Sequence, residues 1–195
     1  MIWFSADTHF CSEDTLKREG RPFKNYEEFD NFVIDLWNKE VSKDDIIYHL
    51  GDFCNYNDFF KDNWENGLKI VSNINCKVIL IIGNNEQRII DEKFSGNFDK
   101  FRNFCISLGF EDVNKNCVLI YDKKEFYLNH FPSKHLDGYI NLFGHTHKAT
   151  GLYKPFGLNV CCDLNYFKLF SLLDILRLLK EKEIFWDNDI DCNCH

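Results

Sequence analysis

The sequence predicts an α/β fold in which two sheets pack against each other and are flanked by helices. Short apolar runs alternate with segments of helical periodicity in the first half of the chain, and apolar runs follow one another closely in the second half. The alternation is typical of strands joined by helices, and the strand-rich half indicates a second sheet. At 195 residues and 45% hydrophobic composition, the chain can build one large core, so we expect one domain over residues 1–195.

Strands are expected where a short apolar run is rich in β-branched and aromatic residues, because that composition is typical of strands buried on both faces. In chain order these runs are residues 2–6, 46–50, 78–82, 118–121, 126–128, 140–143 and 158–161. The polar residues Asp122, Lys123 and Lys124 lie between two of the runs. Residues 118–128 are therefore expected to form a hairpin.

Helices are expected where apolar residues recur every three or four positions. These segments are a short turn that opens at Ser12, residues 26–41, 58–73 and 99–108, and a leucine-rich segment from Ser171 to about Glu183. Gly109 can end the fourth segment, and Ser171 with Asp174 resembles a capping box for the last one. The leucine stripe of the last helix is expected to pack in the core.

The charge balance and the apolar pattern exclude several classes of protein. Acidic residues outnumber basic ones by 31 to 23, for a net charge of -8, so strong binding to duplex nucleic acid is not expected. No apolar stretch is long enough to span a bilayer, and the N-terminal run lacks the basic flank of a signal peptide. We expect a cytoplasmic protein that does not bind membranes.

The 9 cysteines are scattered without paired CxxC motifs, so reduced and mostly buried thiols are expected. The tail offers Cys192, Cys194 and His195 as metal ligands. A structural zinc site needs four positioned ligands, so the tail is not expected to form one.

Side chains that bind metals repeatedly appear where a predicted strand stops. In chain order the motifs are Asp7-x-His9, Gly51-Asp52, Gly83-Asn84, His130 and Gly144-His145-x-His147. In α/β sheets, ligands bind beyond the carboxyl ends of strands, where such side chains converge. Imidazole and carboxylate groups without a thiolate favour a catalytic site for first-row divalent ions over a structural zinc site.

These motifs, in this order, resemble the signature of the calcineurin-like metallophosphoesterase superfamily, which reads D-x-H, G-D, G-N-H-D, a single H and G-H-x-H. The resemblance extends from Asp7 to His147, and the segments around the motifs look like a small bacterial and phage-type branch of predicted phosphoesterases. It implies the metallophosphatase fold, a four-layer α/β/β/α sandwich of two mixed sheets. It also implies a hydrolase that cleaves phosphodiester or phosphomonoester bonds with a metal-activated hydroxide.

The resemblance implies a site for two divalent ions. One ion would be held by Asp7, His9 and His147 and the other by Asn84, His130 and His145, with Asp52 as the bridge. Asp52, Asn84 and His145 are also expected to take part in catalysis. Manganese is the expected metal, with iron, nickel, cobalt or zinc as alternatives. Two ions about 3.5 to 4 Å apart can activate a water and clamp a phosphoryl group.

The chain departs from the family pattern at G-N-H-D, which reads Gly83-Asn84-Asn85-Glu86. In the family, the histidine of this motif is commonly assigned to protonate the leaving oxygen, which Asn85 cannot do. Loss of a general acid costs about 10² to 10⁴ in rate. We therefore expect substrates with good leaving groups, such as phosphodiesters, aryl phosphates or cyclic nucleotides, unless His49, His135 or metal-bound water replaces the acid.

Other residues near the motifs are candidates for substrate binding or for support of the ligands. Arg21, Arg88 and Lys134 are candidates for binding a phosphate, and His49 and Asn85 for supporting the ligands. The expected partner is a phosphate ester, for example one derived from a nucleotide; no protein partner is predicted. The alternative function is a scaffold that binds metal without turnover, which Asn85 favours and the complete ligand set opposes.

Overall fold

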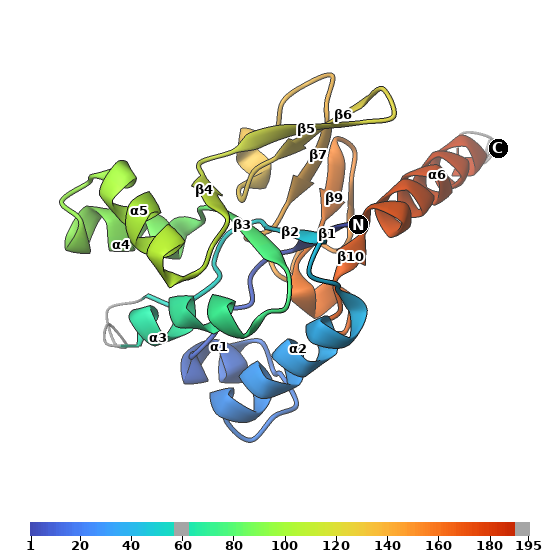
Figure 1. Cartoon of the computed structure of the whole chain (residues 1–195). Helices are drawn as coiled ribbons and strands as arrows, with labels where there is room; N and C mark the ends of the chain where they lie inside the picture. Colours follow the sequence, from blue (N-terminus) through green and yellow to red (C-terminus); the bar gives the residue numbers. More distant parts are fainter. Residues whose placement is uncertain (57–62, 190–195) are drawn as a thin grey trace.

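The computed structural model describes residues 1–56 and 63–189, and its strands form two five-stranded sheets (Figure 1). The first sheet has the order β10-β1-β2-β3-β4 and the second the order β5-β6-β7-β9-β8. The strands are β1 (Ile2–Ser5), β2 (Ile46–His49), β3 (Lys77–Ile81), β4 (Asp112–Asn114), β5 (Cys117–Tyr121), β6 (Lys124–Leu128), β7 (Ile140–Phe143), β8 (Tyr153–Lys154), β9 (Gly157–Asn159) and β10 (Phe170–Ser171).

The register of both sheets brings the carboxyl ends of parallel strands to the same level. In the first sheet β1 to β4 are parallel, and Ser5, His49 and Leu80 are successive register partners. In the second sheet β6, β7 and β9 are parallel, and β5 and β8 pair antiparallel at the edges. A parallel bridge between Ala6 and Cys161 joins the ends of β1 and β9. Loops from both sheets therefore meet at this edge, where α/β proteins bind ligands.

The helices are α1 (Glu13–Arg18), α2 (Tyr26–Glu40), α3 (Trp64–Lys69), α4 (Asn84–Lys93), α5 (Phe98–Leu108) and α6 (Leu172–Asp189), with 3-10 turns η1 (Ile70–Asn73), η2 (Pro132–Lys134) and η3 (Cys162–Leu164). Several begin at side chains that satisfy the free amide groups of the first turn. Ser12, Asn25 and Asn97 each accept a hydrogen bond from a backbone N–H of the helix that follows.

Two apolar clusters form the core. The larger one lies between the first sheet and helices α2 to α5, where Trp37, Leu68 and Phe101 pack against Ile47 and Val78. The smaller one lies between the sheets and joins residues of β1 and β3 to residues of β6, β7 and β9. The buried start of α6 packs against this second cluster, together with residues at the amino ends of β1 and β7. The start of helix α6 therefore packs on the sandwich at the end opposite to the converging loops.

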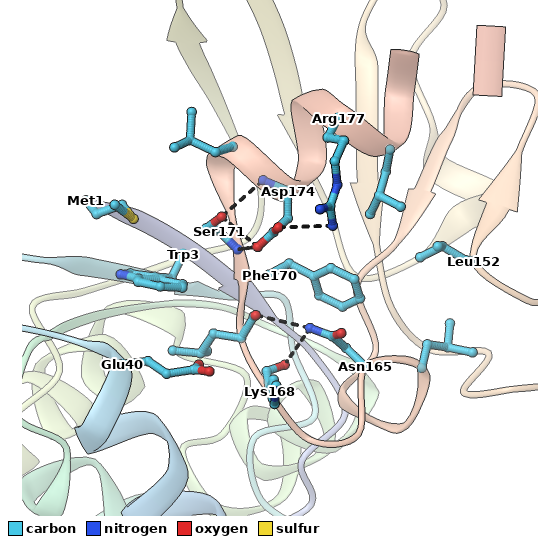
Figure 2. Close-up of a pocket in the computed structure, with 14 residues that line it drawn as sticks. Met1, Trp3, Glu40, Leu152, Asn165, Lys168, Phe170, Ser171, Asp174 and Arg177 are labelled. Atoms are coloured by element: carbon cyan, nitrogen blue, oxygen red, sulfur yellow. Dashed lines mark hydrogen bonds and ion pairs between the residues drawn. The ribbon is translucent and has the colours of Figure 1, made fainter. Parts of the chain in front are cut away.

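The start of α6 has the capping box that the sequence predicts (Figure 2). Ser171 Oγ accepts from the Asp174 N–H at 3.0 Å, and the Asp174 carboxylate accepts from the Ser171 N–H at 3.1 Å. A cavity of about 670 Å³ opens beside this cap and is lined by Met1, Trp3 and Phe170, among others. It contains none of the predicted ligands and is therefore separate from the converging loops.

The prediction of an α/β fold with two mixed sheets and flanking helices is confirmed. The structure also confirms the hairpin, the strand at 140–143 and the helices near 26–41 and 99–108. The described part of the segment 58–73 forms α3 and η1. The elements α4, β4, β8 and β10 were not predicted from the sequence. The three strands are two or three residues long, and the only apolar residues of α4 are Ile89 and Ile90. None of these elements therefore carries a long periodic pattern of apolar residues.

No helix in the described ranges combines the length and apolarity that a membrane span requires. The seven cysteines in this part of the chain are free thiols. The tail with Cys192, Cys194 and His195 lies outside the described residues.

Candidate metal centre

The predicted ligands lie in the loops that follow strands of both sheets. Asp7 and His9 follow β1, Asp52 follows β2, Asn84 opens α4 after β3, His130 follows β6, and His145 and His147 follow β7. Positive φ angles occur at Asp7 (59°), His9 (49°), Asp52 (53°), His145 (72°) and His147 (45°). Non-glycine residues rarely adopt this left-handed conformation, and such strain clusters at functional sites. The turns aim these side chains at a common centre.

The first group of ligands consists of Asp7, His9 and His147, whose ligand atoms lie within 4.8 Å of one another. The Nε2 atoms of His9 and His147 are 3.2 Å apart, and their rings are stacked. Asp7 is fully buried, and its two oxygens accept from the His145 N–H at 2.9 and 3.0 Å. Burial raises the pKa of Asp7, and the nearby His130 and His147 oppose that rise without cancelling it.

The second group consists of Asn84, His130 and His145. Asn84 Oδ1 lies 3.1 Å from His130 Nε2 and 3.0 Å from His145 Nδ1. His130 Nδ1 lies 2.7 Å from the Leu50 carbonyl oxygen and donates to it, so the neutral ring presents the lone pair of Nε2 to the site. Burial lowers the pKa of His130 and so favours that neutral ring.

Asp52 lies between the two groups. Its Oδ2 atom is 3.6 Å from His9 Nε2 and 3.7 Å from His130 Nε2. Its Oδ1 atom accepts from the Asn85 N–H at 2.9 Å. Asp7, Asp52 and His130 also have ligand atoms within 4.8 Å of one another, so the two groups form one continuous cluster.

The donor atoms fit divalent metal ions. The buried carboxylates of Asp7 and Asp52 face the lone pair of His130 Nε2, so buried hydrogen-bond acceptors meet one another. Such an arrangement is unfavourable unless a cation lies between the acceptors. A mixture of imidazole nitrogen and carboxylate oxygen donors suits manganese and the related first-row ions.

Behind the first group lies a buried ion pair of Arg21 and Asp163. Arg21 Nε and Nη2 donate to the Asp163 carboxylate at 2.9 and 3.0 Å, and each side chain is only 2% exposed. The guanidinium also donates to the main-chain oxygens of Thr8 at 2.6 Å and Asp7 at 2.8 Å. His147 Nδ1 donates to Asp163 Oδ2 at 2.9 Å. The pair therefore holds the loop that carries two of the predicted ligands, Asp7 and His9, and the ring of a third, His147.

Arg21 is consequently not placed to bind a substrate, which corrects the interpretation drawn from its closeness to Asp7 in the sequence. Protein acceptors occupy its donors, and the residue is buried. Asp163 was not predicted from the sequence. Asp163 follows the apolar run at 158–161, just as the predicted ligands follow the apolar runs of their strands. This position was the signal that could have identified it.

Asn85 and Glu86 hold the loop of Asp52. Asn85 Oδ1 accepts from the Tyr56 N–H at 2.8 Å, while the Asn85 N–H donates to Asp52. The fully buried Glu86 carboxylate accepts from the N–H groups of Gly83 and Asp52 at 2.8 Å and of Phe53 at 2.9 Å. Burial, followed by the nearby Asp52 charge, raises the pKa of Glu86 to about 8. The G-N-N-E segment is thus a rigid support for the bridge.

His49 supports the loop that carries Asp7 and His9. Its Nε2 atom lies 3.0 Å from Thr8 Oγ1, between the ligands Asp7 and His9, and its ring packs edge-on against Phe53. Burial lowers the pKa of His49 to about 3, so the ring is neutral. His135 stacks on Phe156 with ring centroids 4.1 Å apart. Neither histidine lines the cleft at the ligands, so neither replaces the missing acid there.

A cleft of about 330 Å³ opens onto the ligands. Arg18, Glu19, Asn55 and Tyr56 form part of its wall. Arg88 also lines it and pairs with Glu92 at 3.6 Å. Lys134 lies outside this cleft, on a neighbouring one that also includes Asn84 and Arg88.

The sequence model of the calcineurin-like phosphoesterases matches residues 1–186. The chain belongs to the calcineurin-like phosphoesterase family. The candidate metal-binding groups and the two sheets of this family member agree with that assignment.

This calcineurin-like phosphoesterase is similar to three known proteins over most of its length. An uncharacterized protein of Methanocaldococcus jannaschii, MJ1445, is 28% identical over 193 residues, which cover 94% of this chain and 93% of that protein. The crystal structure of AQ665 from Aquifex aeolicus, a protein of unknown function, has a TM-score of 0.66 at 22% identity and covers 91% of this chain and 98% of its own. This structural likeness concerns the fold. The phosphoesterase YfcE of E. coli superposes with a TM-score of 0.43 at 16% identity, over 82% of this chain and 77% of its own.

Proposed function

We propose that this member of the family is a hydrolase for phosphate esters with good leaving groups and works with two divalent ions, manganese first among them. Membership of the calcineurin-like phosphoesterases supports the reaction class. The acceptor-rich cluster around Asp52 supports the two ions. The single observation that carries the preference for good leaving groups is the position of Asn85, which occupies the place of the family's acid.

In this proposal the ligands prepare the site in three ways. Asp52 is the shared carboxylate, and its position is maintained by the N–H of Asn85 and by Glu86. Asn84 contributes an amide oxygen without a further negative charge. His9, His130 and His145, whose pKa values are lowered by burial, contribute neutral nitrogens, and His147 contributes its Nε2 atom. When bound, the two ions supply an activated water and stabilise charge on the phosphoryl oxygens.

The preference for good leaving groups follows from the side chains that line the cleft. Asn85 is 5% exposed, and its amide is engaged with the backbone of Tyr56. The Tyr56 hydroxyl donates to Glu92 at 2.8 Å. Among the described residues, the histidines that line the cleft are all members of the ligand cluster. A leaving oxygen therefore meets no imidazole acid beyond the ligand cluster in the described part of the cleft, and only a stable leaving group departs fast.

A pair of substrates tests this proposal. The manganese-loaded protein is expected to hydrolyse bis(p-nitrophenyl) phosphate at least about 10²-fold faster, relative to the uncatalysed rates, than an alkyl phosphate. Asp52→Asn is the control for the site and should abolish both activities. Equal enhancement for the two substrates would contradict the preference, and full activity of Asp52→Asn would contradict the metal mechanism.

Asn85→His tests the reason for the preference. An imidazole at this position should raise the rate on the alkyl phosphate by about 10- to 100-fold and change the rate on the p-nitrophenyl ester much less. The pH profile for the alkyl phosphate should acquire a new basic limb, which a change of structure alone would not produce. An identical change for both substrates would count against the missing acid as the cause.

The scaffold alternative is distinguished by the same measurements. It is favoured by Asn85 and predicts bound metal in stoichiometric amount without turnover of any ester. Metal analysis of the purified protein, combined with the substrate pair, therefore separates an active enzyme from a metal-binding scaffold.

A further inference from the structure

A second cleft, of about 420 Å³, lies beside the metal centre and shares Asn84 and Arg88 with the first. We call it the lysine cleft, after Lys115 and Lys134 on its walls. The ring of Phe131, which also lines it, is centred 4.8 Å from the ring of His130 and 4.9 Å from that of His145. Its volume lies within the range of small-molecule sites, roughly 300 to 1,000 Å³. A molecule bound at the metal ligands can therefore extend past Phe131 into this cleft.

The charge of the lysine cleft is opposite to that of the chain. Its walls include Arg88, Lys115 and Lys134, whereas none of its described lining residues is an aspartate or glutamate. The protein as a whole has a net charge of -8. Within the described residues, neither lysine makes an ion pair: Lys134 Nζ lies 4.6 Å from the ring centroid of Phe131, and Lys115 Nζ lies 5.2 Å from that of Phe98. Their charges remain available to an anion.

The cleft also has an aromatic and amide lining. Tyr127 of β6 is 8% exposed, and its hydroxyl accepts from Asn129 Nδ2 at 3.2 Å. Asn129 Oδ1 accepts from the Phe131 N–H at 2.8 Å and so fixes the loop that carries this ring. Asn116 and Gln87 add amide groups that can donate and accept hydrogen bonds. Aromatic faces with nearby amides are the features that bind a planar, polar heterocycle.

We propose that the lysine cleft binds a nucleoside phosphate, so that the substrate is a phosphate ester whose nucleoside carries a second phosphate in addition to the one at the metal ions. The base would lie against Tyr127 and Phe131, and the second phosphate would contact Lys115 and Lys134. This inference rests on the proposed phosphoesterase function. It names the class of substrate, because the first cleft alone gives no reason for a second anionic group.

Two substrates that differ only in the second phosphate test the proposal. They are thymidine 5′-(p-nitrophenyl phosphate) and its derivative with an additional 3′-phosphate, and both release p-nitrophenolate. The manganese-loaded protein is expected to favour the 3′-phosphorylated substrate by about tenfold in kcat/KM, mainly through a lower KM. Equal kcat/KM values for the two substrates would overturn the proposal and leave the phosphoesterase function intact.

The double variant Lys115→Ala/Lys134→Ala is expected to lose this preference. The matched control is Lys43→Ala/Lys100→Ala, which removes the same charge from two exposed lysines outside both clefts and should retain it. Loss of the preference in both double variants would assign it to net charge and would contradict a site in the lysine cleft.

Calorimetry measures nucleotide binding without depending on turnover. Thymidine 3′,5′-bisphosphate should bind to the Asp52→Asn protein about tenfold more tightly than thymidine 5′-monophosphate, and Lys115→Ala/Lys134→Ala in that background should remove the difference. If neither ester is hydrolysed but this difference is observed, the phosphoesterase proposal fails and the nucleotide cleft stands. If the two nucleotides bind equally, the cleft proposal is wrong whatever the activity.

Discussion

Arg21 and Asp163 show how single side chains behind a metal site determine its geometry. The guanidinium joins the backbone of Asp7 and Thr8 to a carboxylate that in turn orients His147. Burial disfavours the charge of Asp163, but the hydrogen bonds from His147 and Arg21 outweigh burial and hold its pKa well below the usual range. A partner carboxylate of this kind fixes the tautomer of a ligating histidine and raises its basicity.

Asp163→Asn is expected to weaken manganese binding by about 10- to 100-fold, because His147 loses its orienting anion. The measurement is the manganese concentration that gives half-maximal p-nitrophenyl ester hydrolysis, with recovery of most of the activity at saturating metal. The variant should also lose stability, since Arg21 is left without its full charge partner. Asp137→Asn, at an exposed carboxylate, is the control. A lower melting temperature with an unchanged manganese concentration for half-maximal hydrolysis would show that Asp163 acts on the fold alone.

Helix α2 illustrates how an element can carry a buried charge next to the site. Asp30 of α2 accepts from the Cys11 N–H at 3.0 Å, and its other oxygen is buried without a hydrogen-bond partner among the described residues. Burial raises the pKa of Asp30 to about 7, against the lowering effects of the Cys11 hydrogen bonds and Arg21. The helix therefore keeps the loop after β1 in place at an electrostatic cost.

The stability of the protein should fall as Asp30 ionises. The folded state holds this proton up to a pH of about 7, whereas the unfolded chain releases it near the ordinary pKa of 3.8. The contribution of Asp30 is therefore fully favourable below that lower value and is lost as pH rises through the folded pKa. The Asp30→Asn variant has no proton to release at this position. The difference in free energy of unfolding between the variant and the natural chain should therefore grow, in favour of the variant, by roughly 3 kcal/mol from pH 5 to pH 8. Urea unfolding of both proteins at pH 5 and at pH 8 measures this difference. The control is Asp35→Asn, at an exposed position of α2.

The loop after β7 depends on the absence of a side chain at Gly144. A Cβ atom there would lie 2.6 Å from both the Ala6 Cβ and Asp7 Oδ2. Gly144→Ala should therefore cost about 1 to 3 kcal/mol and displace Asp7, with a loss of manganese affinity. Gly96→Ala is the matched control, because Gly96 has a φ of +74° and nothing within 4 Å, so it tests backbone strain alone. Equal manganese affinities for the two variants would contradict the steric role of Gly144.

For the molecule as a whole, the two sheets and the metal ligands depend on each other. Asp7 and Asp52 come from the first sheet and His130, His145 and His147 from the second, so an ion bound among them connects both halves of the sandwich. Ligands that bind only the folded state stabilise it by mass action. Metal should accordingly act as a structural brace as well as a cofactor.

Removal of metal is expected to lower the melting temperature. At manganese concentrations about 100-fold above the dissociation constant, the stabilisation is about 2.7 kcal/mol, or roughly 5 to 10 °C for a chain of this size. Thermal unfolding after chelation and after return of manganese measures this difference. Asp52→Asn should abolish most of it, and a melting temperature that does not respond to manganese in the natural chain would contradict metal binding at this cluster.

The sequence by itself predicted the two sheets and the order of the motifs, because strands reveal themselves by short apolar runs and ligands by their position directly after them. It also located the departure at Asn85, since residue type alone excludes an imidazole acid. Short elements such as β4 and β10 carry too few residues for a periodic pattern. The tertiary structure decided the roles of Arg21, Asp163 and His49, because hydrogen bonds between residues up to 142 positions apart leave no local pattern. The lysine cleft likewise leaves no local pattern in the sequence. Lys115 and Lys134 line the same cavity only when β3, β4 and β6 assemble.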